Sequence, residues 1–431
     1  MPSAASGRGG GTSTLFAWGC GEDGQLGAAE APTPGATETN DWCVEAPRAV
    51  ELGESASGVI VSACAGSRNS VCVTTRDDSS SCEAYAWGWN SHRALGFSYE
   101  ECDELHVKTP KRHSSMKTED GERINVVAIA SGGWHAVCVD SDGVAYGYGG
   151  NEYAQAGPPD ANAEHRNTSI PDRDWAPIRA LLWPPRKVSL PAPVAQVSCG
   201  GMSSFALLHD GRVFEWGQTS EDDEPRTAPR QLDAKDKHVV EIAAGSFHLL
   251  MRTRNGEVMS YGNGSYGQLG LGATGAADVC RVIETFGRLG VVKIAAGGWH
   301  SAAVTAGGVL YTWGRGEYGR LGHGDDVKDK VVPKLVELDE SVFIADIALG
   351  GSHSCAITAE GNVLSWGRTT LGRLGRVIRD PSSSTCGVPS RVAFPPLPNG
   401  KRWKALKISC GGRHTLAVCT VSTDDADVPT A

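Results

Sequence analysis

The sequence predicts an all-β fold, a closed seven-bladed β-propeller, on three observations. The 431-residue chain contains 55 glycines, a share typical of turn-rich β proteins. One sequence unit recurs seven times along the chain. The chain starts with the second half of that unit and ends with the first half, so both ends together would complete one blade.

The recurring unit combines β-branched runs with glycines at fixed spacing. It reads as an apolar run, Gly-Gly-x-His, a second apolar run, a glycine eight residues after the histidine and an aromatic-glycine pair, as in residues 129–149. The histidine position is held in chain order by Asn69, His135, Ser203, His248, His300, His353 and His414. The aromatic position is held by Trp18, Trp87, Tyr148, Trp216, Tyr261, Trp313 and Trp366. The strict spacing indicates that all copies fold alike.

Each copy predicts a four-stranded antiparallel blade. Three alternating runs joined by glycine turns predict three strands, and a proline-marked segment such as 332–338 predicts the fourth. One such sheet cannot bury both faces, so neighbouring blades must stack in a ring. Residues 15–27 and 408–419 would share the closing blade and leave no free sheet edge. We expect the propeller over residues 15–420, with disordered tails at 1–14 and, acidic in composition, at 421–431.

The repeat histidines and tryptophans are predicted to be structural. Copies of one residue around a ring lie far apart, so His135, His248, His300, His353 and His414 do not predict a metal site or a catalytic cluster. They are expected to hydrogen-bond backbone groups at the double-glycine turns. Trp18, Trp87, Trp216, Trp313 and Trp366 are expected to wedge between blades. The glycine pairs are expected to take positive φ and to let backbones approach closely.

The residue before each histidine position carries the functional prediction, and we call these seven residues the slot residues. They are Arg68, Trp134, Met202, Phe247, Trp299, Ser352 and Arg413. By symmetry they lie on one face of the disc, where a turn has little structural reason to be apolar. Aromatic residues, Met and Arg are the types enriched at protein interfaces. The alternative is that each side chain folds over its own blade.

Regions that depart from the repeat are further candidates. The acidic stretch Glu221, Asp222, Asp223 and Glu224 replaces the usual Gly-x-Leu-Gly element, and it is either a solvated loop or a contact for a basic partner. Three inserts, 28–58, 97–122 and 158–193, exceed ordinary connections.

Composition excludes several classes of function. The net charge of −10 and the absence of long basic runs argue against nucleic-acid binding. No nucleophile-base pair, phosphate loop or metal-ligand spacing is present, so neither a catalytic residue nor a cofactor is predicted. The 13 cysteines lack a CxxC pair and read as buried free thiols, which favours the cytoplasm or nucleus. No membrane span or secretory signal is expected.

The GGxH and WGxxxxGxLG motifs quoted above resemble the regulator of chromosome condensation family over nearly all of residues 15–419. The resemblance implies a choice among an exchange factor for the small GTPase Ran, a chromatin binder, a plant UV-B photoreceptor and interaction modules. The family's exchange factor uses acidic residues at the slot, and here the slot holds none. The photoreceptor's tryptophan cluster is also interrupted, because Met202 and Phe247 separate Trp134 from Trp299.

We therefore expect a protein-binding propeller whose slot face docks a protein partner or a second copy. A guanine-nucleotide exchange factor for a small GTPase is the alternative. A homodimer like the UV-B photoreceptor, which illumination would dissociate, is the second alternative.

Overall fold

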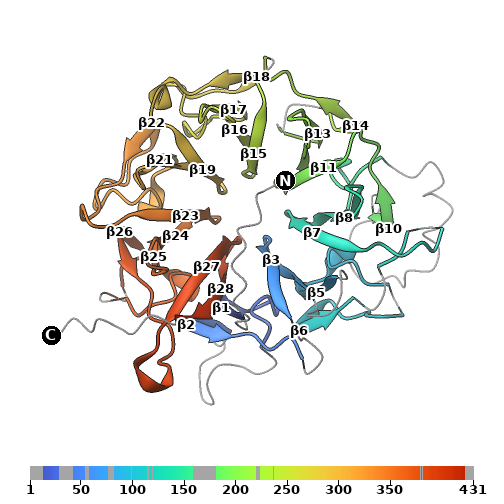
Figure 1. Ribbon diagram of the computed structural model, residues 1–431, viewed down its shortest axis with the longest axis horizontal. Coiled ribbons are helices and arrows are strands. Elements are labelled where there is room, and N and C mark those ends of the chain that lie inside the picture. Colours follow the sequence, from blue (N-terminus) through green and yellow to red (C-terminus); the bar gives the residue numbers. More distant parts are fainter. Residues whose placement is uncertain are drawn as a thin grey trace.

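Seven four-stranded antiparallel sheets form a ring (Figure 1). Their innermost strands surround a central channel. This computed structural model describes residues 13–28, 42–53, 58–75, 82–98, 100–113, 116–118, 120–158, 181–219, 224–235, 237–378, 380 and 382–422. The predicted all-β seven-bladed propeller is confirmed. Of the predicted tails, residues 1–12 and 423–431 lie outside the described residues, whereas Thr14 and Val421, predicted as tail, belong to the first and last strands. None of the helices in the described ranges has the length and apolar character needed to cross a bilayer.

Six blades follow one another along the chain, each with its first strand innermost. Blade 1 is β3 (Val59–Ala65), β4 (Asn69–Thr75), β5 (Cys82–Trp89) and β6 (His106–Arg112); blade 2 is β7 (Val126–Ser131), β8 (His135–Asp140), β9 (Ala145–Gly150) and β10 (Leu181–Lys187); blade 3 is β11 (Val194–Cys199), β12 (Ser203–Leu208), β13 (Val213–Gly217) and β14 (Arg226–Gln231). Blade 4 is β15 (Val239–Ala244), β16 (His248–Thr253), β17 (Val258–Gly262) and β18 (Ala277–Val282); blade 5 is β19 (Val291–Ala296), β20 (His300–Thr305), β21 (Leu310–Gly314) and β22 (Lys330–Leu335); blade 6 is β23 (Ile344–Leu349), β24 (His353–Thr358), β25 (Val363–Arg368) and β26 (Thr385–Arg391). Short 3₁₀ helices occupy Ser91–Arg93, Glu284–Phe286, Glu317–Gly319, Thr370–Gly372 and Pro398–Gly400.

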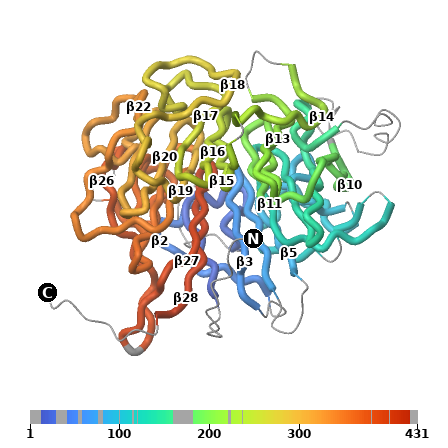
Figure 2. The backbone as a smooth tube through the Cα atoms, turned by 45° about the horizontal axis from the view of Figure 1, so that its top comes forward, coloured from blue at the N-terminus to red at the C-terminus, as the bar shows by residue number. Residues whose placement is uncertain are grey.

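Blade 7 closes the ring by joining the two ends of the sequence. Its strands are β27 (Trp403–Cys410), β28 (His414–Val421), β1 (Thr14–Cys20) and β2 (Cys43–Ala49), in that spatial order from the centre outward. β1 pairs with β28 in continuous register from Thr14 opposite Cys419 to Gly19 opposite His414. Figure 2 shows β27 and β28, in red, beside the blue β3 of blade 1. Closure by pairing of N- and C-terminal strands is therefore confirmed.

The boundaries of the outer strands differ from the sequence prediction. β2, β6 and β10 lie inside the three segments predicted as inserts, so those segments supply the fourth strands of blades 7, 1 and 2. β27 begins at Trp403 rather than at residue 408, and β22 begins and ends earlier than the predicted 332–338. All thirteen cysteines are free, but six of them are half-buried rather than buried.

The repeat tryptophans lie between blades. Trp18, Trp87, Trp216, Trp313 and Trp366 are at most 1% exposed. In four of the five, the indole N–H donates to a backbone carbonyl of the preceding blade, as from Trp313 to Gln268 at 2.8 Å. The indole nitrogen of Trp216 has no hydrogen-bond partner among the described residues.

The glycine pairs allow close approach of the backbones, as predicted, but the prediction that they take positive φ is wrong. The double glycines, such as Gly297 and Gly298, do not have positive φ. A Cβ on Gly297 would lie 2.6 Å from the carbonyl oxygen of Gly350 in the next blade. Positive φ occurs instead at the glycine of each aromatic-glycine pair, for example Gly314 at +100°. A side chain would force neighbouring blades apart at Gly297 and would clash with the paired strand at Gly314.

Candidate protein-binding face

The five repeat histidines bridge each blade to the next through hydroxyl groups. The Nε2 atom of each lies 2.8–2.9 Å from the hydroxyl oxygen of a Ser or Thr in the following blade: His414 with Ser70, His135 with Ser204, His248 with Ser301, His300 with Ser354 and His353 with Thr415. The sequence prediction expected backbone partners at the double-glycine turn. The observed Nε2 partner is a side chain, and we call each such pair an inter-blade staple.

The hydroxyl group determines which ring nitrogen of the histidine donates, and burial keeps the ring neutral. Ser354 Oγ donates to the carbonyl oxygen of Arg320, at 2.7 Å. Its proton is thereby used, so His300 must donate from Nε2, and in the neutral form its Nδ1 carries no proton. Burial lowers the pKa of His135 and His248 to about 3 and that of His414 to about 4. Burial, followed by nearby arginines, holds the pKa values of His300 and His353 well below the usual value. These histidines are neutral at pH 7.

The sequence contains a signal for the staples that the repeat analysis missed. The hydroxyl residue directly follows the histidine position of its own blade, and it is present only where the preceding blade supplies a histidine. Blades 1 and 3 carry Asn69 and Ser203 at the histidine position, and the next blades carry Ala136 and Leu249 in place of the hydroxyl. The histidine of one blade and the hydroxyl residue of the next blade are therefore present together or absent together around the ring.

A double-mutant cycle tests one staple. His300→Ala and Ser354→Ala should each lower the free energy of unfolding by about 1–3 kcal/mol, because each leaves a buried polar group without its partner. Their combined effect should fall short of the sum by at least about 0.5 kcal/mol, measured by urea unfolding. His300→Ala combined with Ser70→Ala, which belongs to another staple, is the control and should be additive. Additivity in the His300 and Ser354 pair would contradict the staple.

The slot residues have one backbone position in all seven blades. In each, the slot carbonyl accepts a hydrogen bond from the residue that follows the aromatic-glycine pair, at 2.7–3.0 Å: Arg68 from Trp89, Trp134 from Gly150, Met202 from Gln218, Phe247 from Asn263, Trp299 from Arg315, Ser352 from Arg368 and Arg413 from Cys20. The backbone at the slot is thus held without any contribution from its side chain. Because this backbone position is equivalent in every blade, the seven slot residues lie at one face of the disc, which we call the slot face.

Exposure differs around the slot face. Trp134 is 40% exposed, while Met202, Phe247 and Trp299 are half-buried. Ser352 is buried, and its hydroxyl accepts a hydrogen bond from Arg373 at 2.6 Å. The side chain of Arg413 is 57% exposed.

Arginines pack on aromatic rings next to the slot residues. The guanidinium group of Arg68 lies 4.5 Å from the ring centre of Trp89 and makes a bidentate hydrogen bond to Asp23. Arg315 lies 4.6 Å from the ring centre of Tyr266 and 5.7 Å from that of Trp299. Each site therefore combines the apolar area of a ring with a guanidinium group held in place, which suits protein contact.

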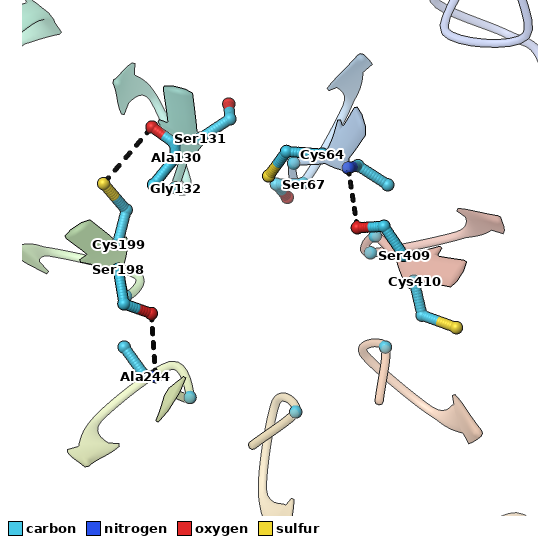
Figure 3. Close-up of a pocket in the computed structure, with 18 of the residues that line it drawn as sticks. Cys64, Ser67, Ala130, Ser131, Gly132, Ser198, Cys199, Ala244, Ser409 and Cys410 are labelled. Atoms are coloured by element: carbon cyan, nitrogen blue, oxygen red, sulfur yellow. Dashed lines mark hydrogen bonds between the residues drawn. The ribbon is translucent and has the colours of Figure 1, made fainter. Parts of the chain in front are cut away.

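Two other candidate binding sites, the acidic stretch and the central channel, offer fewer groups for binding a partner. In the predicted acidic stretch, residues 221–223 lie outside the described residues, and Glu224 is exposed. The inner strands line a central channel of about 400 Å³, whose walls are mainly glycine, alanine and serine with Cys64, Cys199 and Cys410 (Figure 3).

Within the described ranges, His353, Cys355 and Cys410 group closely enough to bind a metal. However, Nε2 of His353 belongs to a staple with Thr415, and burial together with Cys355 raises the pKa of Cys410, which opposes its thiolate form. We assign no metal to this group.

Comparison with known proteins agrees with the fold. Residues 179–426 match the family described as RCC1-like domain, and residues 13–73 and 83–139 match the regulator of chromosome condensation (RCC1) repeat. The E3 ubiquitin-protein ligase HERC2 of Homo sapiens is 32% identical over 426 residues, which are 95% of this chain but 8% of the ligase. The ultraviolet-B receptor UVR8 of Arabidopsis thaliana is 28% identical over 341 residues, which are 77% of this chain and 70% of the receptor.

A solved structure of Prp20p from Saccharomyces cerevisiae superposes with a TM-score of 0.74 at 21% identity, covering 96% of this chain and 93% of that one. At this identity the likeness shows the fold alone. Together with the seven in-register repeats and the closing blade, the sequence matches show that the chain belongs to the regulator of chromosome condensation repeat family.

Proposed function

We propose that this chain is a protein-binding propeller that docks a partner on its slot face. The observation that carries the proposal is the ring of seven slot carbonyls. Because the backbone is held through these carbonyls, no slot side chain is required for the turn. Trp134, Met202, Phe247 and Trp299 nevertheless occupy four consecutive blades, and the arginines follow on either side of the ring closure.

Truncation of two tryptophans tests this function. Trp134→Ala/Trp299→Ala should lose partner proteins that the wild type captures from an extract of the source organism, read by mass spectrometry, because large rings dominate interface energies. Leu335→Ala/Val388→Ala removes exposed apolar side chains from the outer strands β22 and β26 and should lose none. Identical capture by both variants would contradict the slot face as the binding surface.

Nucleotide exchange on a small GTPase is the second candidate. Prp20p, which has the same fold, has binding properties to Gsp1p and histones. This binding is a property of Prp20p and only suggests what to test for this chain. Exchange requires only a surface that stabilises the nucleotide-free GTPase, with no reacting side chain. The slot here has no Asp or Glu. A small GTPase lost specifically from the tryptophan variant, with faster release of its fluorescent GDP in the presence of the wild type, would favour exchange.

A further inference from the structure

Six arginines collect on the slot face of four consecutive blades, 5, 6, 7 and 1. They come from three recurrent positions: after the aromatic-glycine pair, in the Gly-x-Leu-Gly element, and at the slot. We call Arg315, Arg320, Arg368, Arg373, Arg413 and Arg68 the arginine arc. In blades 2, 3 and 4 the first and third of these positions hold no charged residue.

Two members of the arc are buried, and their hydrogen bonds go to neutral groups. Arg320 donates to the carbonyl oxygens of Glu317 and Gly351, and Arg373 donates to the carbonyl oxygen of Thr370 and the hydroxyl of Ser352. Their side chains are anchored across the boundary between blades 5 and 6 and within blade 6. The guanidinium groups therefore have fixed positions before any ligand arrives.

An aromatic ring connects the arc between blades 5 and 6. The guanidinium groups of Arg368 and Arg320 lie 4.5 Å and 5.6 Å from the ring centre of Tyr318. Such stacking orients the planar groups while leaving N–H groups for another acceptor. Tyr318, Tyr266 and Trp299 also supply apolar surface directly beside the charges.

The carboxylates near the arc do not neutralise it. Glu317 lies 2.5 Å from Arg315 and 3.5 Å from Arg320, Glu22 lies 3.8 Å from Arg413, and Asp23 pairs with Arg68. Three carboxylates therefore lie within ion-pair distance of the six guanidinium groups, and Asp329 acts on Arg320 from farther away. In the part of the chain that the structure describes, no carboxylate lies within ion-pair distance of Arg368 or Arg373, and the buried Nε of Arg368 has no hydrogen-bond partner.

The pKa values reflect this surplus of positive charge. Burial lowers the pKa of Arg320 and of Arg373 to about 10, and repulsion from neighbouring arginines adds to the effect in both. Both remain protonated at pH 7. The whole chain has a net charge of −10, so the surplus of positive charge is local to the arc. An anionic ligand bound there would reduce the repulsion among the arginines.

We propose that the arginine arc binds an acidic peptide segment of a partner protein. Guanidinium groups match carboxylates in bidentate geometry, and the interleaved rings would hold the aliphatic side chains of the same segment. Nucleic acid is disfavoured, because the acidic chain as a whole repels a polyanion. This inference rests on the proposed function and adds the chemistry of the partner.

Fluorescence anisotropy with a defined peptide tests the arc. The probe is a labelled decapeptide that alternates Asp and Glu with Leu and Tyr, beside its Asn and Gln counterpart. We expect saturable binding of the acidic probe only, weakening as salt rises from about 50 to about 300 mM. Arg368→Gln/Arg413→Gln should weaken binding about 10- to 100-fold, since two charge-assisted hydrogen-bonding groups are lost. Arg212→Gln/Arg281→Gln, which removes two surface arginines outside the arc, should bind like the wild type.

Several outcomes would overturn the inference: no saturable binding below about 1 mM probe, equal binding by the arc variant, or tighter binding of single-stranded RNA or a phosphopeptide. Capture from extract separates this failure from that of the proposed function. If the Trp134→Ala/Trp299→Ala variant loses partners while the arc variant retains all of them, the slot face binds without an acidic segment. If neither variant loses any, the proposed function fails.

Discussion

Lowering the pH from 7.5 to 5 should unfold the propeller, because the five staple histidines are buried in the neutral form. Their folded-state pKa values lie far below the unfolded value of about 6.5. As the pH falls below 6.5, the unfolded chain takes up protons that the folded chain excludes. The contribution of the neutral histidines to the free energy of unfolding is therefore fully present above about pH 6.5. It is lost as the pH falls toward their folded-state pKa values of about 3 to 4.

The expected size of this effect is large. Each histidine contributes a loss of about 1.4 kcal/mol per pH unit within that window, so five contribute roughly 7 kcal/mol per unit. A domain is stable by about 5–15 kcal/mol in total. Urea unfolding followed by tryptophan fluorescence at pH 7.5, 6.5, 6.0 and 5.5 should show the midpoint falling steeply below pH 6.5.

Asparagine variants assign the effect to the staples. His300→Asn should reduce the number of protons taken up on unfolding by about one. The slope of the free energy of unfolding against pH should therefore fall by about 1.4 kcal/mol per pH unit. Asparagine already occupies the equivalent position at Asn69, where its side chain accepts a hydrogen bond from Ser131. His209→Asn, at an exposed histidine, is the control and should leave the slope unchanged. A carboxylate with a lowered pKa does not mimic this loss: Lys330 and Lys334 lower the pKa of Asp326, so its contribution disappears only at more acidic pH. A stability that stays flat from pH 7.5 to 5.5 would contradict neutral buried histidines.

The ring could be predicted from the sequence because its inner strands carry glycines at fixed spacing. The outer strands carry no such signature, so the repeat pattern assigns the residues of β2, β6 and β10 to inserts. An outer strand is half-exposed and pairs on one side, so it tolerates proline and needs no strict apolar alternation. Pro47 in β2 and Pro110 in β6 are the sequence signal for these strands.

The slot face could be predicted only in part. The slot is a single position of the repeat, so its seven residues can be identified by aligning the copies. The arginine arc combines residues from three positions of the repeat. Arg320 and Arg373 occupy the variable position of Gly-x-Leu-Gly, and one copy of the repeat does not show which residue type that position prefers. Arg413 and Glu22 become neighbours only when the ring closes. Three-dimensional placement was needed to show that these charges form one surface.

Trp313→Ala should lower the free energy of unfolding by about 3–5 kcal/mol, the usual cost of removing a fully buried large aromatic side chain. Trp313 is 0% exposed, its ring centre lies 5.5 Å from that of Phe286, and its indole N–H donates to Gln268 across the boundary with blade 4. Even a Cβ on Gly270 would lie 2.9 Å from its Nε1, so the surrounding backbone is shaped to this ring.

Trp299→Ala is the matched control for this change, because it removes the same side chain from the same blade. Trp299 is half-buried at the slot, where its ring centre lies 6.5 Å from that of Tyr266 and 5.7 Å from the guanidinium group of Arg315. Its loss should cost about 1 kcal/mol or less in urea unfolding, since no cavity forms inside the blade. The two tryptophans thus separate stability from binding: Trp313→Ala should destabilise the ring, whereas Trp299→Ala should preserve the ring and remove part of its binding surface. Equal costs for the two variants would mean that Trp313 is not a wedge, or that Trp299 is a core residue and unsuited to a docking role.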